Sequence, residues 1–195
     1  MKSGLLQNDI PGQLDEISMI KTSRIVLRDK DPSDAWDDYS WETDPELAKL
    51  DAAPVSFISY SQYLADYTWD LRTPRTTSRQ FAVDTLDGKH IGNCSYYNLD
   101  KYRGEAEMGI MIGDRDYWNK GYGVDVTSAL LDHIFQQTKT NRVHLKTLDW
   151  NARAQKCFRK CGFAECGQKS LDGFSFTLME ISRAGWEAAR ELDRE

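Results

Sequence analysis

The stretch from Arg103 to Gly123 reads RGEAEMGIMIGDRDYWNKGYG and combines a strand, a short turn and a glycine-rich loop. Along residues 105–112 the side chains alternate with the period of two that is typical of a half-buried strand. One face carries Ala106, Met108, Ile110 and Ile112, and the other carries Glu105, Glu107, Gly109 and Met111. The pattern predicts a strand that presents a glutamate beside a glycine and a methionine.

The loop at residues 119–123, NKGYG, leads into a segment in which Val126, Leu130 and Ile134 recur every four residues, as on one side of a helix. A helix start leaves backbone N–H groups unpaired, and glycines allow the positive φ angles that aim them at one point. Such a loop suits a phosphate or a pyrophosphate. A plain tight turn is the alternative, and the flanking strand and helix favour the anion site.

Two other phosphate-binding patterns do not fit the loop. A dinucleotide fingerprint needs a third glycine, where this sequence has Val126. A P-loop needs its lysine after the last glycine, whereas Lys120 precedes Gly121.

Length and composition indicate one domain of ordinary globular type, with 195 residues, 40% hydrophobic and 29% charged. No stretch approaches the roughly 20 apolar residues of a membrane span, and the N-terminus lacks a signal sequence, so we expect a cytoplasmic protein. The net charge of −6 argues against a nucleic-acid partner. A negative net charge would attract cationic amines, but the need for solubility would also account for a negative net charge.

The four cysteines, Cys94, Cys157, Cys161 and Cys166, do not have the spacing of a metal site, and we interpret them as reduced, packed thiols. No metal is expected.

Turn and cap signals divide the rest of the chain. Residues 1–16 form an expected leader, and residues 17–28 contain the first strand. Ser33 or Asp34 is predicted to cap a helix at residues 35–43, and Asp44 begins another at Pro45. The remaining elements expected are a helix at residues 59–71, strands at 79–85, 90–97 and 142–148, a helix from Asn151 to Gly162, a hairpin at 164–181 and a terminal helix capped by Ser182.

Several motifs in order resemble the GNAT superfamily of acetyl-CoA-dependent N-acetyltransferases. They are AEMG at residues 106–109, WNKGYGVD at 118–125, NARA at 151–154 and RKCGF at 159–163, and the similarity extends over roughly residues 20–182. The RimJ/RimL-type enzymes are the most similar branch, with the spermidine N-acetyltransferases nearby. The resemblance implies an α/β (α+β) domain at residues 17–195, with a mixed, mostly antiparallel sheet of about seven strands flanked by helices.

The resemblance also implies the reaction: direct attack of a primary amine, either a protein N-terminus or a small amine, on the thioester of acetyl-CoA. Because an alkyl ammonium must lose a proton first, a carboxylate base is useful. Glu107 is the predicted base, and Glu105 on the same face is the fallback. A solvated surface glutamate is the structural alternative for Glu107.

For the cofactor, the resemblance implies pairing with the strand backbone, a pyrophosphate on the loop amides, and contacts from the following helix. The predicted cofactor-binding residues are Ile110, Met111, Ile112, Asn119, Lys120, Gly121, Tyr122, Gly123, Val124, Asn151 and Phe158. Early helices line the acceptor pocket in this family, and their aromatic residues are either part of it or part of the core. These residues are Trp36, Trp41, Tyr60, Tyr63, Tyr67 and Trp69.

One position departs from the family pattern. The spermidine branch carries a tyrosine, thought to protonate the leaving sulfur, where this chain has Phe158. Cys157, Tyr96, Tyr97 or water must then supply the proton, or the thiolate leaves unaided. The missing hydroxyl keeps open a catalytically silent acyl-CoA sensor or scaffold. A nucleotide-binding domain is the alternative outside the family, and a homodimer is common among the relatives.

Overall fold

The computed structural model describes residues 19–73 and 75–192, so the leader expected at residues 1–16 lies outside the described residues. Within them the helices are α1 (Ala35–Glu42), α2 (Pro45–Leu50), α3 (Tyr60–Arg72), α4 (Tyr122–Gln137), α5 (Ala152–Lys160) and α6 (Arg183–Leu192), with 3-10 turns η1 (Pro32–Asp34) and η2 (Arg115–Tyr117). The strands are β1 (Ile20–Lys21), β2 (Ile25–Arg28), β3 (Arg79–Thr85), β4 (His90–Asp100), β5 (Glu105–Ile112), β6 (Arg142–Leu148), β7 (Ala164–Leu171) and β8 (Phe174–Ser182). None of these helices is both long enough and apolar enough to cross a membrane.

The strands form one sheet in the order β1-β2-β3-β4-β5-β6-β8-β7. Neighbours are antiparallel except for β5 and β6, which run parallel, so the mixed, mostly antiparallel sheet predicted from the sequence is confirmed. The described strands number eight rather than about seven, because a turn closed by the Thr22 N–H on the Ile25 carbonyl, at 2.9 Å, divides the first predicted strand into β1 and β2.

Strands β5 and β6 separate after a short parallel ladder. Their register runs only from Glu105 opposite Arg142 to Glu107 opposite His144, while β6 stays paired with β8 as far as Leu148. The second half of β5, residues 108–112, therefore has no strand partner on the β6 side. Any ligand that enters there can meet unpaired backbone groups.

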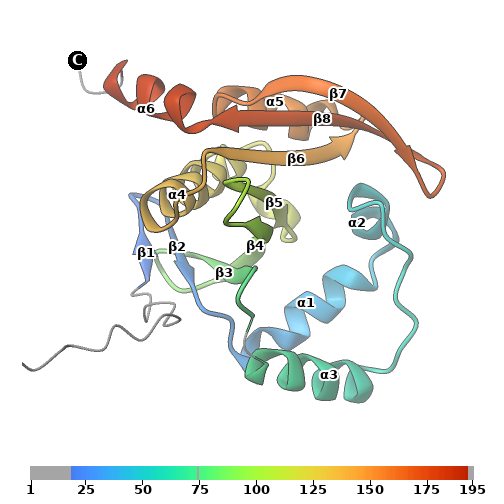
Figure 1. Ribbon diagram of the computed structural model, residues 1–195. Coiled ribbons are helices and arrows are strands. Elements are labelled where there is room, and N and C mark those ends of the chain that lie inside the picture. The colour runs from blue at the N-terminus through green and yellow to red at the C-terminus, as the bar shows by residue number, and fades with distance from the viewer. Residues whose placement is uncertain (1–18, 74, 193–195) are drawn as a thin grey trace, which may run out of the picture.

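The two faces of the sheet meet different helices (Figure 1). Helix α4 covers the face of Ala106 and Met108, and its own Val126, Leu130 and Ile134 are fully buried there. Helices α1 and α3 lie side by side on the opposite face, where Asp38 of α1 contacts His90 and Asn93 of β4, and Asp34 of η1 binds Arg28 of β2. The face of β5 that carries Glu107 is therefore turned toward α1 and α3.

Side-chain caps fix the helix starts, with one difference from the sequence prediction. Asp44 accepts hydrogen bonds from the Glu46 and Leu47 N–H groups, and Asn151 caps α5 through the Ala154 N–H at 3.1 Å, as predicted. For α1 the prediction was Ser33 or Asp34: Asp34 is the N-cap residue, but the side-chain cap bond was wrong, because Asp34 makes none there and the Ser33 hydroxyl donates to Asp31. The Asp34 carboxylate is held by Arg28 instead.

Candidate active site

A cavity of about 550 Å³ opens where β5 and β6 separate. Its walls come from the end of β5, the loop that enters α4, the start of α5, and α2. Ten of the eleven residues predicted to bind a cofactor line this cavity: Ile110, Met111, Ile112, Asn119, Gly121, Tyr122, Gly123, Val124, Asn151 and Phe158. Lys120 is the one left outside. Segments from three parts of the sequence thus meet in one place.

The loop before α4 turns a row of free amides toward one place. Gly121 has φ +88° and Asn119 has φ +59°, which gives the left-handed turns that such a loop needs. The Val124 and Asp125 N–H groups donate to the Gly121 carbonyl. Among the described residues the N–H groups of residues 119–123 have no acceptor. Unpaired amides at the start of a helix make an anion site.

Arg24, just before β2, holds this loop from behind. Its guanidinium donates to the Lys120 carbonyl at 2.9 Å, pairs with Asp125 at 3.1 Å, and lies 4.2 Å from the ring centre of Tyr122. A trans peptide directs its C=O and N–H in opposite directions, so fixing the Lys120 carbonyl also fixes the Gly121 N–H. The sequence analysis missed Arg24, since no local pattern connects residues 96 positions apart.

The wall of the cavity formed by α5 is cationic. Arg153, Lys156 and Lys160 line it, and Arg153 lies 3.6 Å from the ring centre of Trp118. Asp51 is the single acidic side chain among the described residues that line the cavity. The combination of free amides and positive side chains suits a ligand that carries several phosphates.

A second cavity, of about 450 Å³, lies on the α1 and α3 side of the sheet and has the opposite charge. Four carboxylates line it, from Glu42, Asp51, Asp66 and Asp70. Lys30 is the single basic side chain among its described lining residues, and its ammonium group is 2.5 Å from Asp38. The two cavities share three lining residues, Asp51, Ile110 and Met111.

Two of the six aromatic residues considered for an acceptor pocket line the second cavity, namely Tyr63 and Tyr67. The other four, Trp36, Trp41, Tyr60 and Trp69, do not. Trp41 packs elsewhere, with its ring centre 5.0 Å from that of His90 and its ring against Gly113, where a Cβ atom would come within 2.1 Å.

Glu107 lines neither cavity. Its carboxylate accepts from Lys146 at 2.6 Å, from the Tyr97 hydroxyl at 3.0 Å and from Asn98 at 3.2 Å. Burial raises the pKa of Glu107, but the hydrogen bond and charge of Lys146, with the other two donors, lower it more. Gly109, the next residue on the same face, lines the second cavity, so Glu107 lies one strand repeat, ~7 Å, from it. The fallback, Glu105, pairs with Arg142 at 2.5 Å.

The three side chains considered as proton donors to sulfur occupy different surroundings. Cys157 lines the first cavity beside Phe158. Tyr96 is buried on the α4 side next to His133, and the hydroxyl of Tyr97 is bound to Glu107. Cys157 is thus the one of these three that reaches the cavity.

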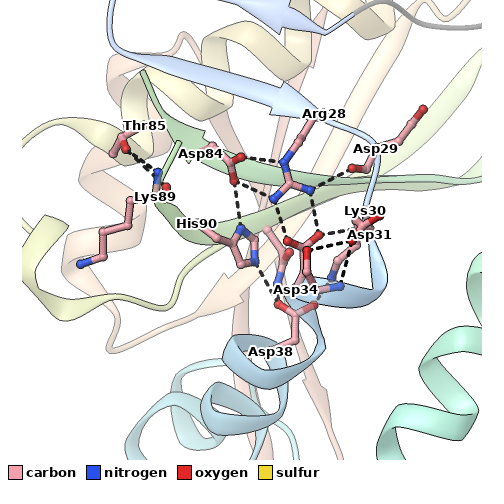
Figure 2. A network of polar contacts seen from close by, with 12 residues as sticks. Arg28, Asp29, Lys30, Asp31, Asp34, Asp38, Asp84, Thr85, Lys89 and His90 are labelled. Carbon is pink, nitrogen blue, oxygen red and sulfur yellow. Dashed lines mark hydrogen bonds and ion pairs between the residues drawn. The ribbon is translucent and has the colours of Figure 1, made fainter. Parts of the chain in front are cut away.

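A buried polar network connects η1 and α1 to β2, β3 and β4 of the sheet (Figure 2). Arg28 is bound at 2.6 Å both to Asp34 and to Asp84. His90 lies between Asp84 at 3.3 Å and Asp38 at 3.4 Å. Since both ring nitrogens face carboxylates, the network favours the doubly protonated imidazolium.

The stability of the protein should depend on pH through His90. Burial lowers the pKa of His90, but the hydrogen bond to Asp38 and the charges of Asp34, Asp38 and Asp84 raise it more, so the net shift is upward. A raised folded-state pKa stabilises the fold fully below the unfolded value of about 6.5. That stabilisation is lost as pH rises through the folded value. Urea unfolding between pH 6 and 9 should show that the free energy of unfolding falls more steeply with pH for wild type than for His90→Gln. Equal slopes for the two proteins would contradict a raised pKa of His90 in the folded state.

Comparison with known proteins agrees with this geometry. The family model described as acetyltransferase (GNAT) domain matches residues 24–164. A relative called uncharacterized N-acetyltransferase p20, from Bacillus licheniformis, is 25% identical over 174 residues, covering 84% of this chain and 97% of the relative.

Two solved structures share the fold. Spermidine N-acetyltransferase from Vibrio cholerae, in complex with CoA and spermine, superposes with a TM-score of 0.75 at 18% identity, covering 85% of this chain and 99% of that one. The aminoglycoside acetyltransferase AAC(6')-Ib, in complex with coenzyme A, gives a TM-score of 0.71 at 18% identity with the same coverage, 85% and 99%.

Proposed function

This chain belongs to the acetyltransferase (GNAT) domain family, and we propose from its two cavities which amine it acetylates. It is an N-acetyltransferase that uses acetyl-CoA as its co-substrate. The acceptor we propose is a small amine with more than one positive charge, which attacks the thioester directly. The observation that carries this proposal is the junction of a cationic cavity with an acidic cavity at Ile110 and Met111.

The first cavity has the features that acetyl-CoA requires. The free amides of residues 119–123 would bind the pyrophosphate, and Arg153, Lys156 and Lys160 would face the phosphates. The unpartnered half of β5 offers backbone groups to the pantetheine arm, although the Ile112 carbonyl already accepts from the Trp118 indole at 2.6 Å. The thioester would then lie near the end of the cavity that Ile110 and Met111 share.

The second cavity has the features that a polycationic amine requires. Its carboxylates exceed its ammonium groups four to one, and Lys30 is already paired with Asp38. Two buried polar atoms of its lining residues, the Asn93 amide oxygen and the Tyr67 hydroxyl, lack a hydrogen-bond partner within the described residues. The ammonium groups of a polycation would pair with the four carboxylates that line the cavity. Spermine and the aminoglycosides named for the two structural neighbours are amines of this kind.

We expect the acceptor preference to follow the number of positive charges. The kcat/KM for spermidine or kanamycin, measured from initial rates of CoA release, should exceed the kcat/KM for a peptide N-terminus at least about tenfold. This ratio corresponds to about 1.4 kcal/mol. Asp66→Asn should raise the KM for the preferred polyamine by about fivefold, because one charge pair near the surface contributes up to about 1 kcal/mol. The KM for acetyl-CoA should not change.

Asp172→Asn is the matched control for this variant, since Asp172 is an exposed acidic residue in the β7 to β8 turn and lines neither cavity. Equal kcat/KM values for spermidine, kanamycin and a peptide N-terminus would contradict the proposed acceptor. Binding of acetyl-CoA without thiol release for any amine would instead indicate a sensor or scaffold.

Finer assignments stay predictions. The RimJ/RimL-type subgroup, a homodimer and Glu107 as base, acting directly or through one water molecule, were predicted from the sequence and belong to this group. The four free cysteines fit a reducing compartment and support the predicted cytoplasmic location.

A further inference from the structure

We propose that Asp51 is a catalytic residue that takes the proton from the acceptor ammonium group. The proposal rests on the function proposed above, because it places the acetyl donor in one cavity and the amine in the other. Direct transfer requires the two reactants to meet where the cavities join. Asp51, Ile110 and Met111 line both cavities, and Asp51 alone among these three carries a titratable group.

The chain holds Asp51 at this junction through α2. The helix starts at the Asp44 cap and ends at Asp51, whose N–H donates to the Leu47 carbonyl at 2.9 Å. Arg115 of η2 fixes the start of the helix by binding Asp44 at 2.8 Å and Glu46 at 2.9 Å. Helix α2 is thereby attached to the segment that leads into the amide loop.

The Asp51 carboxylate is free to accept a proton. It makes no hydrogen bond or ion pair with any other described residue, and its side chain is exposed to the cavities. Partial removal from water by the surrounding protein raises the pKa of Asp51, and the negative charge of Glu42 raises it further. The positive charge of Lys146 lowers it, but by less. Tyr97 is also close enough to interact with the Asp51 charge. Asp51 also lies at the C-terminus of α2. The negative end of the helix dipole raises the pKa of its carboxylate, as the charge of Glu42 does.

Glu107 presents the opposite case. Its oxygens are occupied by Lys146, Tyr97 and Asn98, whose hydrogen bonds and charge hold its pKa below the ordinary value, so Glu107 can take up a proton only by giving up its ion pair with Lys146. A base works best when its pKa approaches the pH of the reaction. The contacts of Glu107 suit a residue that holds Lys146 in place.

The proton balance of the step is as follows. One Asp51 oxygen takes a proton from the ammonium group, which leaves a neutral amine and a carboxylic acid. The nitrogen lone pair forms the C–N bond to the thioester carbonyl, and the C–S bond then breaks. The second N–H proton of the intermediate passes to the leaving sulfur, giving the amide and CoA thiol. Asp51 returns its proton to water in the open cavity.

The test compares Asp51→Asn with Glu107→Gln in the CoA-release assay, with spermidine as the acceptor. Asp51→Asn should lower kcat by roughly 10²-fold to 10⁴-fold, the range for a general base, and Glu107→Gln by less than about tenfold. Acetyl-CoA affinity in titration calorimetry should equal that of wild type for both, which also shows that both variants fold. The rate of Asp51→Asn should rise about tenfold per pH unit, since only amine that is already neutral reacts.

Two results would overturn the assignment. One is the reverse order of effects, with Glu107→Gln the more damaged enzyme. The other is a rise in the spermidine KM for Asp51→Asn at unchanged kcat, which would make Asp51 a binding residue only. A wild-type enzyme that acetylates only amines with a single positive charge would contradict the proposed acceptor alone, and the comparison of Asp51 with Glu107 would then be made with the amine that it accepts.

Discussion

Gly121→Val is expected to abolish measurable acetyl-CoA binding while the protein stays folded. Gly121 has φ +88°, which a β-branched residue resists, and a Cβ atom there would lie 3.2 Å from the Arg24 guanidinium. The loop would have to rotate, and its amides would no longer converge. Two lost hydrogen bonds to a charged pyrophosphate, at about 1.5–3 kcal/mol each, correspond to a rise in Kd of roughly 10²-fold to 10⁴-fold.

Gly88→Val provides the control for this experiment. Gly88 has φ +84° in the turn between β3 and β4, and nothing lies within 4 Å of its added Cβ atom. The two variants therefore impose similar backbone strain, but one acts in the amide loop and the other far from it. Titration calorimetry should show wild-type affinity for Gly88→Val, and wild-type affinity for Gly121→Val would count against the loop as the pyrophosphate site.

Arg28→Met is expected to cause the largest loss of stability. The side chain of Arg28 neutralises Asp34, which is 2% exposed, and Asp84, which is 7% exposed. Removing one partner of a buried ion pair costs about 3–5 kcal/mol, because the other charge stays buried without compensation. That is a large part of the 5–15 kcal/mol that holds a typical domain folded. Urea unfolding measures the difference.

Arg103→Met is the matched comparison, because Arg103 is 77% exposed and its contact with Asp100 is 3.8 Å long. An exposed pair of this kind contributes about 0–1 kcal/mol. The double variant Arg28→Met with Asp34→Asn should recover part of the loss, since it removes the buried carboxylate for which Arg28 is the cationic partner, whereas Asp84 still faces His90. If Arg28→Met lowers the free energy of unfolding no more than Arg103→Met does, the network does not anchor α1.

Features that depend on neighbours in the sequence could be predicted. The period of two along residues 105–112 gave the two faces of β5, and Asn151 and Gly162 marked the ends of α5. The ordered motifs indicated the family and most residues around the first cavity. Such signals repeat within a few residues, so they can be read without knowing the fold.

Features that depend on tertiary packing could not be predicted. Arg28 and Asp84 are 56 positions apart, and Arg24 reaches Lys120 across 96 positions. The cap bond expected at Asp34 is not made, because its carboxylate binds Arg28, which is also held by Asp84 from a distant part of the sequence. Asp51 follows a short helix and has no pattern of its own, and only the fold brings it to the junction of the cavities.

A crystal structure of the CoA complex tests the central claim most directly. The account predicts the pyrophosphate within hydrogen-bond distance of the N–H groups of Gly121 and Gly123, and the sulfur at the junction lined by Asp51, Ile110 and Met111. CoA bound away from the amide loop, or with its sulfur directed away from the acidic cavity, would contradict it.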